Sequence, residues 1–177
     1  MNSGEVYFSI YEIFFPSIGI GIGDFLTVTG GMSIITGSPE QILFVAPKLR
    51  VVKFEGFQLS TGMIYAGILD ESFGIAYGVF TTGSSTASFT GGLGYGFVNG
   101  DFADNPFLML GGDINLSKSS KLITENWFIP NDDNTIVMSF GLRFYGKHLA
   151  ADFGLIKIPE LDFGFPFFPW VGFAYKF

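Results

Sequence analysis

The sequence predicts an all-β protein, an antiparallel up-and-down transmembrane β-barrel formed by one domain over residues 1–177. Apolar residues recur at every second position over long stretches, a strand signal that a helix does not give. Charged residues make up only 14% of the chain, against roughly 25% in soluble domains. No stretch reaches the roughly 18 to 20 apolar residues of a membrane-spanning helix. The hydrophobic residues are instead dispersed in short pieces, as membrane barrels require.

Turn residues divide the chain into eleven expected strands. Most are long enough to cross a bilayer at a tilt, which takes about 9 to 11 residues. The first is irregular, because Glu12 falls among the apolar positions that Ile18 and Ile20 define, and a bulge near Pro16 would restore its register. The expected ranges are 5–22, 25–36, 41–53, 56–69, 72–82, 86–98, 106–117, 120–129, 134–145, 148–157 and 167–177.

Four of these strands show the alternation most clearly. In each of them bulky apolar residues alternate with glycine, alanine, serine or other small or polar residues, so that every strand has one bulky face. The bulky faces are Phe73, Ile75, Tyr77 and Val79 in 72–82; Phe89, Leu93, Tyr95 and Phe97 in 86–98; Leu108, Leu110 and Ile114 in 106–117; and Ile136, Met138, Phe140, Leu142 and Phe144 in 134–145.

The connections between strands tend to alternate in length. Tight connections at 23–24, 53–55, 83–85, 118–119 and 146–147 alternate with connections at 37–40, 70–71, 99–105, 130–133 and 158–166, several of them longer. Membrane barrels have short periplasmic turns and longer extracellular loops. The tight connections are therefore expected on the periplasmic side.

The last strand carries the most specific signal. Val171, Phe173, Tyr175 and Phe177 share one face, and the chain stops on an aromatic residue. This segment resembles the C-terminal strand of bacterial outer-membrane β-barrel proteins, which those proteins present to their assembly machinery. The resemblance implies an outer-membrane location and the lipid bilayer and the barrel assembly machinery as partners.

The strand count conflicts with that resemblance. Bacterial single-chain barrels have even numbers of strands, and counting back from Phe177 makes the first strand run in the same direction as the last. We therefore expect twelve strands, with one strand and a signal peptide missing from the N-terminus. The alternative is that one strand has been missed in the division of the chain.

The bulky faces are expected to point to lipid. If they pointed inward, the exterior would be mostly small residues with too few charges for a water-exposed surface. The small and polar residues then line the lumen, and Trp127, Trp170 and Tyr145 are expected in aromatic girdles at the membrane interfaces.

Charged residues on the lumen face form the best candidate site. With a two-residue turn at 146–147, Arg143 and Asp152 become diagonal neighbours, and pairing removes the cost of an isolated charge. A structural role for this pair is favoured over transport or catalysis. Asp113, Glu125 and Lys176 are expected to join the same network.

These features favour a small pore, carrier or structural membrane protein without enzymatic activity or a cofactor. The net charge of −7 argues against nucleic acid as a partner. His148 is the one histidine and there is no cysteine, so no transition-metal site is expected and catalytic residues are not assigned. A soluble barrel that binds an apolar ligand and a membrane-embedded lipid-modifying enzyme remain alternatives.

Overall fold

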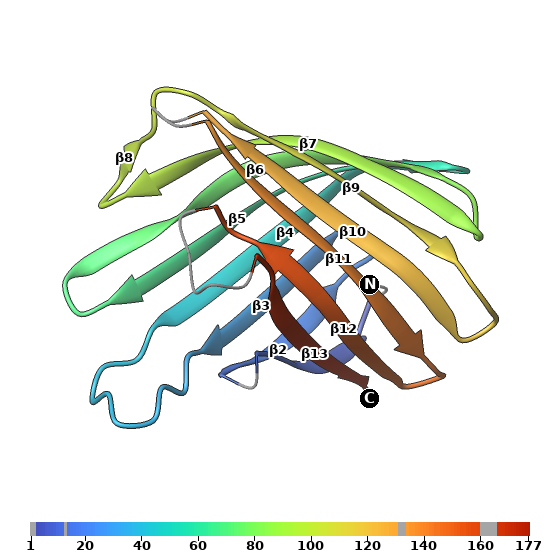
Figure 1. Ribbon diagram of the computed structural model, residues 1–177, viewed down its shortest axis with the longest axis horizontal. Coiled ribbons are helices and arrows are strands. Elements are labelled where there is room, and N and C mark those ends of the chain that lie inside the picture. The colour runs from blue at the N-terminus through green and yellow to red at the C-terminus, as the bar shows by residue number, and fades with distance from the viewer. Residues whose placement is uncertain (1–2, 13, 131–133, 160–165) are drawn as a thin grey trace.

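The computed structural model describes residues 3–12, 14–130, 134–159 and 166–177, which form β-strands joined by turns and loops (Figure 1). Among these residues, no helix is long and apolar enough to span a membrane. The strands in chain order are β1 (Val6–Tyr11), β2 (Phe15–Ile22), β3 (Leu26–Met32), β4 (Leu43–Phe54), β5 (Phe57–Ile68), β6 (Glu71–Gly83), β7 (Ala87–Val98), β8 (Asp101–Phe102), β9 (Phe107–Asn115), β10 (Ser120–Ile129), β11 (Thr135–Tyr145), β12 (Leu149–Lys157) and β13 (Phe168–Lys176).

Twelve of the thirteen described strands form one closed antiparallel barrel. Each of the twelve pairs with two neighbours, and β1 pairs with β13 to close the ring. The remaining strand, β8, is a two-residue piece that pairs with the end of β7. The predicted twelve-stranded, all-β antiparallel barrel is therefore confirmed.

The expected first strand, 5–22, is a hairpin of two strands. Tyr11 pairs with Phe15, and Glu12 enters the turn between them with a positive φ of 52°. The pairing of β1 with β2 is continuous, so the bulge expected near Pro16 does not occur. The twelfth strand thus lies within 5–22, which corrects the expectation that it was missing from the chain.

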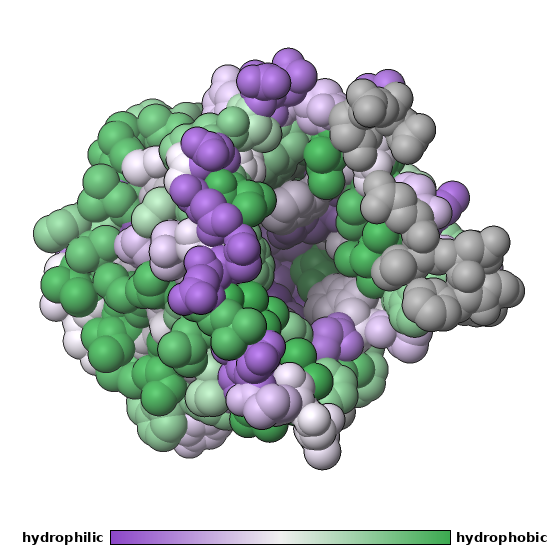
Figure 2. All heavy atoms as spheres, turned by 90° about the vertical axis from the view of Figure 1, so that its left-hand side faces the viewer, coloured by the Kyte–Doolittle hydropathy of each residue, from purple (hydrophilic) through white to green (hydrophobic). Residues whose placement is uncertain are grey.

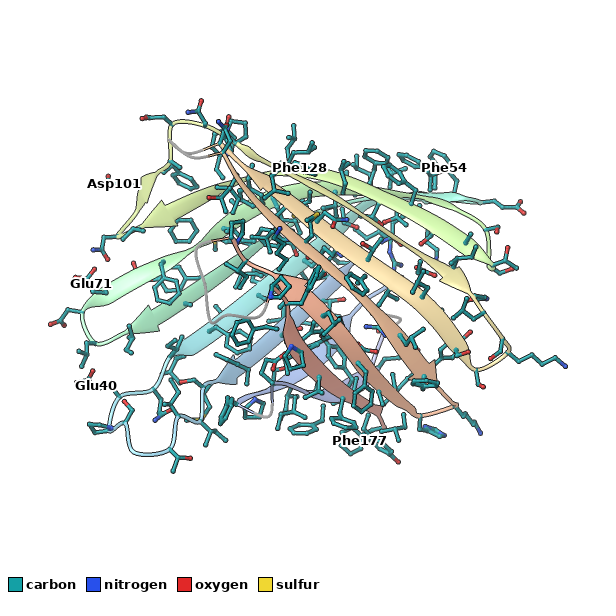
Figure 3. All side chains as sticks on the ribbon, in the orientation of Figure 1. Glu40, Phe54, Glu71, Asp101, Phe128 and Phe177 are labelled. Atoms are coloured by element: carbon teal, nitrogen blue, oxygen red, sulfur yellow. The ribbon has the colours of Figure 1, made fainter. Side chains whose placement is uncertain are left out.

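The connections gather at two ends of the barrel. The end where β1 begins and β13 finishes, here the terminal end, carries the connections 23–25, 55–56, 84–86, 116–119 and 146–148. The opposite end, here the loop end, carries 33–42, 69–70 and 99–106, and Figure 3 shows Glu40, Glu71 and Asp101 there. The longer connections lie together at the loop end, as the alternation in length predicts.

The outer surface is apolar and the inner wall is mostly small or polar. Leu43, Ile18 and Leu93 are 62%, 54% and 55% exposed on the outside, whereas Ser9 and Ser60 on the inside are each 2% exposed. Figure 2 views the loop end, where hydrophobic residues cover the outer surface and hydrophilic residues surround a hollow. The barrel therefore presents to its surroundings the apolar belt that a bilayer solvates.

Strand β6 reverses the facing that the sequence predicts. Val79 pairs with Ser60 of the inner wall, and residues paired across neighbouring strands share a face. Phe73, Ile75 and Tyr77, at every second position from Val79, therefore also face the lumen. Their predicted outward orientation is wrong.

Glycines on the neighbouring strands explain how β6 places bulky residues inside. A Cβ at Gly62 would lie 2.7 Å from the Tyr77 hydroxyl oxygen, and a Cβ at Gly92 would lie 2.5 Å from Cγ1 of Val79. Both distances are well inside van der Waals contact. The side chains of Tyr77 and Val79 fit against the inner wall because these glycines have no side chain.

Replacing Gly62 by alanine is expected to destabilise the barrel by roughly 1–3 kcal/mol, because the added methyl displaces Tyr77. The matched control is Gly78→Ala on β6, where a Cβ would meet nothing within 4 Å. Urea midpoints of the folded barrel in lipid vesicles, followed by gel mobility without heating, measure both. Equal midpoints for the two variants would refute this account of inner-wall packing.

Candidate functional site

The lumen of the barrel holds most of the charged side chains that the strands carry. Arg143 and Asp152 are directly paired across β11 and β12, not diagonal as predicted. The connection is 146–148, one residue longer than the expected two-residue turn, and Tyr145 pairs with Ala150, which shifts the register. The predicted contact itself exists, in a closer arrangement.

The Arg143–Asp152 pair is bidentate. Nε of Arg143 donates to Oδ1 of Asp152 at 2.7 Å, and Nη2 donates to Oδ2 at 2.6 Å. Asp152 is only 4% exposed. A buried carboxylate with both oxygens bonded to one guanidinium is a strong, geometrically fixed pair, and it braces two strands from inside the lumen.

Two further ion pairs involve predicted residues, but with partners that sequence analysis missed. Lys121 of β10 lies 3.3 Å from Asp113 of β9, which also accepts a 2.7 Å hydrogen bond from the Ser88 hydroxyl. Lys176 pairs with Glu5, which precedes β1. The Lys176–Glu5 pair joins the first and last strands of the ring. The sequence could have indicated the Lys121–Asp113 pair, because the two residues lie on the same face of consecutive strands.

Glu125 does not join these pairs. Its carboxylate accepts a hydrogen bond from Nε1 of Trp127 at 2.7 Å. Lys48 and Tyr77, on other strands, interact with the Glu125 carboxylate through its charge. Among the described residues, Glu125 forms no ion pair. The predicted network is therefore several separate contacts along the lumen.

Lys48 and Arg50 of β4 also face the lumen. They pair in register with Gly62 and Ser60 of the inner wall. Arg50 donates from Nη1 to the Asp24 carbonyl oxygen at 2.6 Å, whereas Lys48 forms no ion pair within the described part of the chain. Lys48 is thus a cation available to a solute inside the barrel.

The three aromatic residues predicted for the membrane interfaces face the lumen instead. Trp127 stacks on Phe107 with ring centroids 5.0 Å apart, and a Cβ at Gly154 would meet the indole of Trp170. Tyr145 shares the face of Arg143, two residues before it. The prediction failed because nearness to a strand end does not determine which face a residue occupies.

The C-terminal strand has the predicted facing. Phe173, Tyr175 and Phe177 are 41%, 44% and 73% exposed on the outside. The backbone N–H of Val171 donates to a Glu12 carboxylate oxygen at 3.2 Å, so the strand is also tied to the β1–β2 turn. The outward face of β13 is therefore continuous with the apolar belt.

A cavity of about 630 Å³ opens at the loop end among β5, β6, β7 and β8. Among the described residues that line it, Asp101 is the only charged one, and most of the others are apolar. Five of the apolar residues face the lumen by register: Ile64, Ala66, Phe73, Ile75 and Val98. This part of the lumen differs in character from the ion-paired wall of β9 to β13.

The described residues contain no group of three histidine, cysteine, aspartate or glutamate side chains placed to hold a metal ion. His148 is exposed at the terminal end, where its Nδ1 lies 3.1 Å from the Lys176 carbonyl oxygen. It stacks against Tyr175 with ring centroids 6.2 Å apart.

Comparison with solved structures places the fold among outer-membrane porins. A KdgM porin in complex with disordered oligogalacturonate aligns with a TM-score of 0.75 at 10% identity, and a KdgM porin with 0.73 at 10%, each over 98% of both chains. A NanC porin aligns with a TM-score of 0.62 at 8% identity over 97% of both chains. No family model matches the sequence, and no curated protein matches it. The chain therefore has the fold of the KdgM and NanC outer-membrane porins, a closed twelve-stranded antiparallel β-barrel.

Proposed function

We propose that this barrel is a narrow pore through which small hydrophilic solutes cross the outer membrane. The observation that carries the proposal is a hollow at the loop end, surrounded by hydrophilic residues within an apolar exterior (Figure 2), in a barrel whose lumen face carries ion-paired side chains. Barrels of this size leave a limited channel because side chains fill much of the interior. The proposal assigns no catalytic step to any residue.

The loop end favours cations. Its described connections 33–42, 69–70 and 99–106, with the adjacent Glu71, contain five acidic residues and no lysine or arginine: Glu40, Asp70, Glu71, Asp101 and Asp104. A charged rim of one sign concentrates counterions at a pore mouth. Within the lumen, three of the basic side chains are neutralised by ion pairs. The electrostatic field that a solute meets first is therefore negative.

Passage of acidic oligosaccharides is the second candidate. Oligogalacturonate is the ligand in one of the similar KdgM structures. In this chain, Lys48 and Arg50 are the lumen cations that could attract such a solute, although it must first pass the acidic rim. The sign of the ion selectivity distinguishes the two candidates.

The Arg143–Asp152 pair is proposed to act as a structural brace. It fixes β11 against β12 and narrows the lumen without presenting a free charge. The outward residues of β13, Val171, Phe173 and Tyr175, together with Phe177 directly after it, are proposed to serve as the segment that the barrel assembly machinery binds.

Conductance in planar lipid bilayers tests the pore. Under a KCl gradient, the reversal potential is expected to show K⁺ preferred over Cl⁻. Glu71→Gln with Asp101→Asn should lower that preference by up to about fivefold, since a unit charge about 4 Å from an ion in water contributes about 1 kcal/mol. Glu55→Gln, at the terminal end, is the matched control. Preference for Cl⁻ would instead support the acidic solutes, and absence of conductance would reject the pore.

The brace is tested by a double-mutant cycle. Arg143→Met leaves the buried Asp152 carboxylate unpaired and should cost about 3 kcal/mol of stability, whereas Arg143→Met combined with Asp152→Asn should recover most of that loss. Lys176→Met, which breaks a more exposed pair, should cost less than about 1 kcal/mol. Urea midpoints in vesicles provide the comparison. Similar losses for Arg143→Met and Lys176→Met would rule out a special bracing role.

A further inference from the structure

The apolar cavity at the loop end is not explained by a pore for hydrophilic solutes. Water-filled passage calls for polar walls, yet Phe73, Ile75, Ile64 and Val98 turn apolar side chains into the lumen here. Strand β6 does this while its outward positions in the same stretch are the small residues Gly74, Ala76 and Gly78. Apolar surface of this extent inside a lumen is the usual character of a ligand-binding wall.

The charges around the cavity define the sign of its ligand. Asp101 is the one charged residue that lines it within the described part of the chain. It pairs with Val98 across the β7–β8 hairpin, so its carboxylate is carried on the inner side of the rim. Glu71 lies nearby, because it is bonded to Asn99 in the turn before Asp101. A cation is therefore attracted to the same place where an apolar body is sheltered.

The aromatic ring of Phe73 strengthens that preference. A cation above the face of an aromatic ring is attracted by the negative potential of the ring. The cavity combines that ring with aliphatic side chains and with the Asp101 carboxylate. This combination suits organic ammonium ions better than either inorganic cations or neutral apolar molecules.

We propose that the loop-end cavity binds organic cations with an apolar body, with the ammonium group beside Asp101 and the body against Phe73 and Ile75. This proposal names the class of solute that the pore mouth would select. Transport of that solute rests on the proposed pore function, whereas its binding requires only the cavity.

Three probes separate the contributions of charge and apolar surface. Benzyltrimethylammonium has both features, tetramethylammonium has the same head without the body, and phenylacetate has a similar body with a negative charge. Tryptophan fluorescence reports binding without an added label, because the chain has two tryptophans. Trp127 stacks on Phe107, and the Phe107 ring lies against Gly94 of β7. Gly94 is two residues from Gly96, which lines the cavity. Fluorescence titrations in lipid nanodiscs avoid detergent competition.

Benzyltrimethylammonium is expected to bind about tenfold more tightly than tetramethylammonium, from the apolar surface that it buries, and also more tightly than phenylacetate. Ile75→Ser should weaken benzyltrimethylammonium about fivefold, while Ala76→Ser, one residue away on the lipid face, should not. Asp101→Asn should remove the preference over phenylacetate, whereas Asp104→Asn, outside the cavity lining, should preserve it.

The outcomes distinguish this inference from the proposed pore. Equal affinities for the three probes, or equal effects of Ile75→Ser and Ala76→Ser, would overturn the organic-cation site even if the barrel conducts ions. Selective binding without conductance would support the site and reject the pore.

Discussion

In the hydrocarbon core of a membrane, backbone N–H and C=O groups have no water to bond, so every strand needs a partner on both sides. This barrel meets that requirement by pairing β1 with β13. The closure depends on the turn at Glu12, which converts one long apolar stretch into the two antiparallel strands β1 and β2. Without that turn, the ring would have eleven strands and its first and last strands would run in the same direction.

Closure also determines what the lumen can contain. Side chains alternate between lipid and lumen, so each inward residue competes for limited space with inward residues of the other strands. The barrel meets this limit with glycines beside bulky residues, as at Gly62 and Tyr77, and with paired charges, as at Arg143 and Asp152. The result is a lumen with an ion-paired side and an apolar side.

Sequence alone was sufficient for the features that depend on alternation and on the last strand. The all-β barrel and the outward face of β13 followed from period-two patterns, and the contact between Arg143 and Asp152 followed from their closeness along a hairpin. The patterns gave only eleven strands, and the number twelve came from the even strand count of bacterial barrels. The turn at Glu12 could not be predicted, because no glycine, asparagine or aspartate marks it and apolar residues flank it on both sides.

The facing of β6 could not be predicted for a different reason. Alternation shows that a strand has two faces but does not say which of them is inside, and size was the only guide. The inward orientation of Tyr77 and Val79 depends on space left by Gly62 and Gly92 on the neighbouring strands, which is a property of the assembled sheet. The same limit explains why Trp127 and Trp170 were assigned to the membrane interfaces.

In the closed barrel, the bulky face of β6 points into an aqueous lumen. Because the sequence has no cysteine, single cysteines can be placed at positions 73 to 79 and treated, in lipid vesicles, with a charged thiol reagent that cannot enter the bilayer. The structure predicts rapid labelling at positions 73, 75, 77 and 79 and protection at 74, 76 and 78. The opposite pattern, or uniform protection, would contradict it.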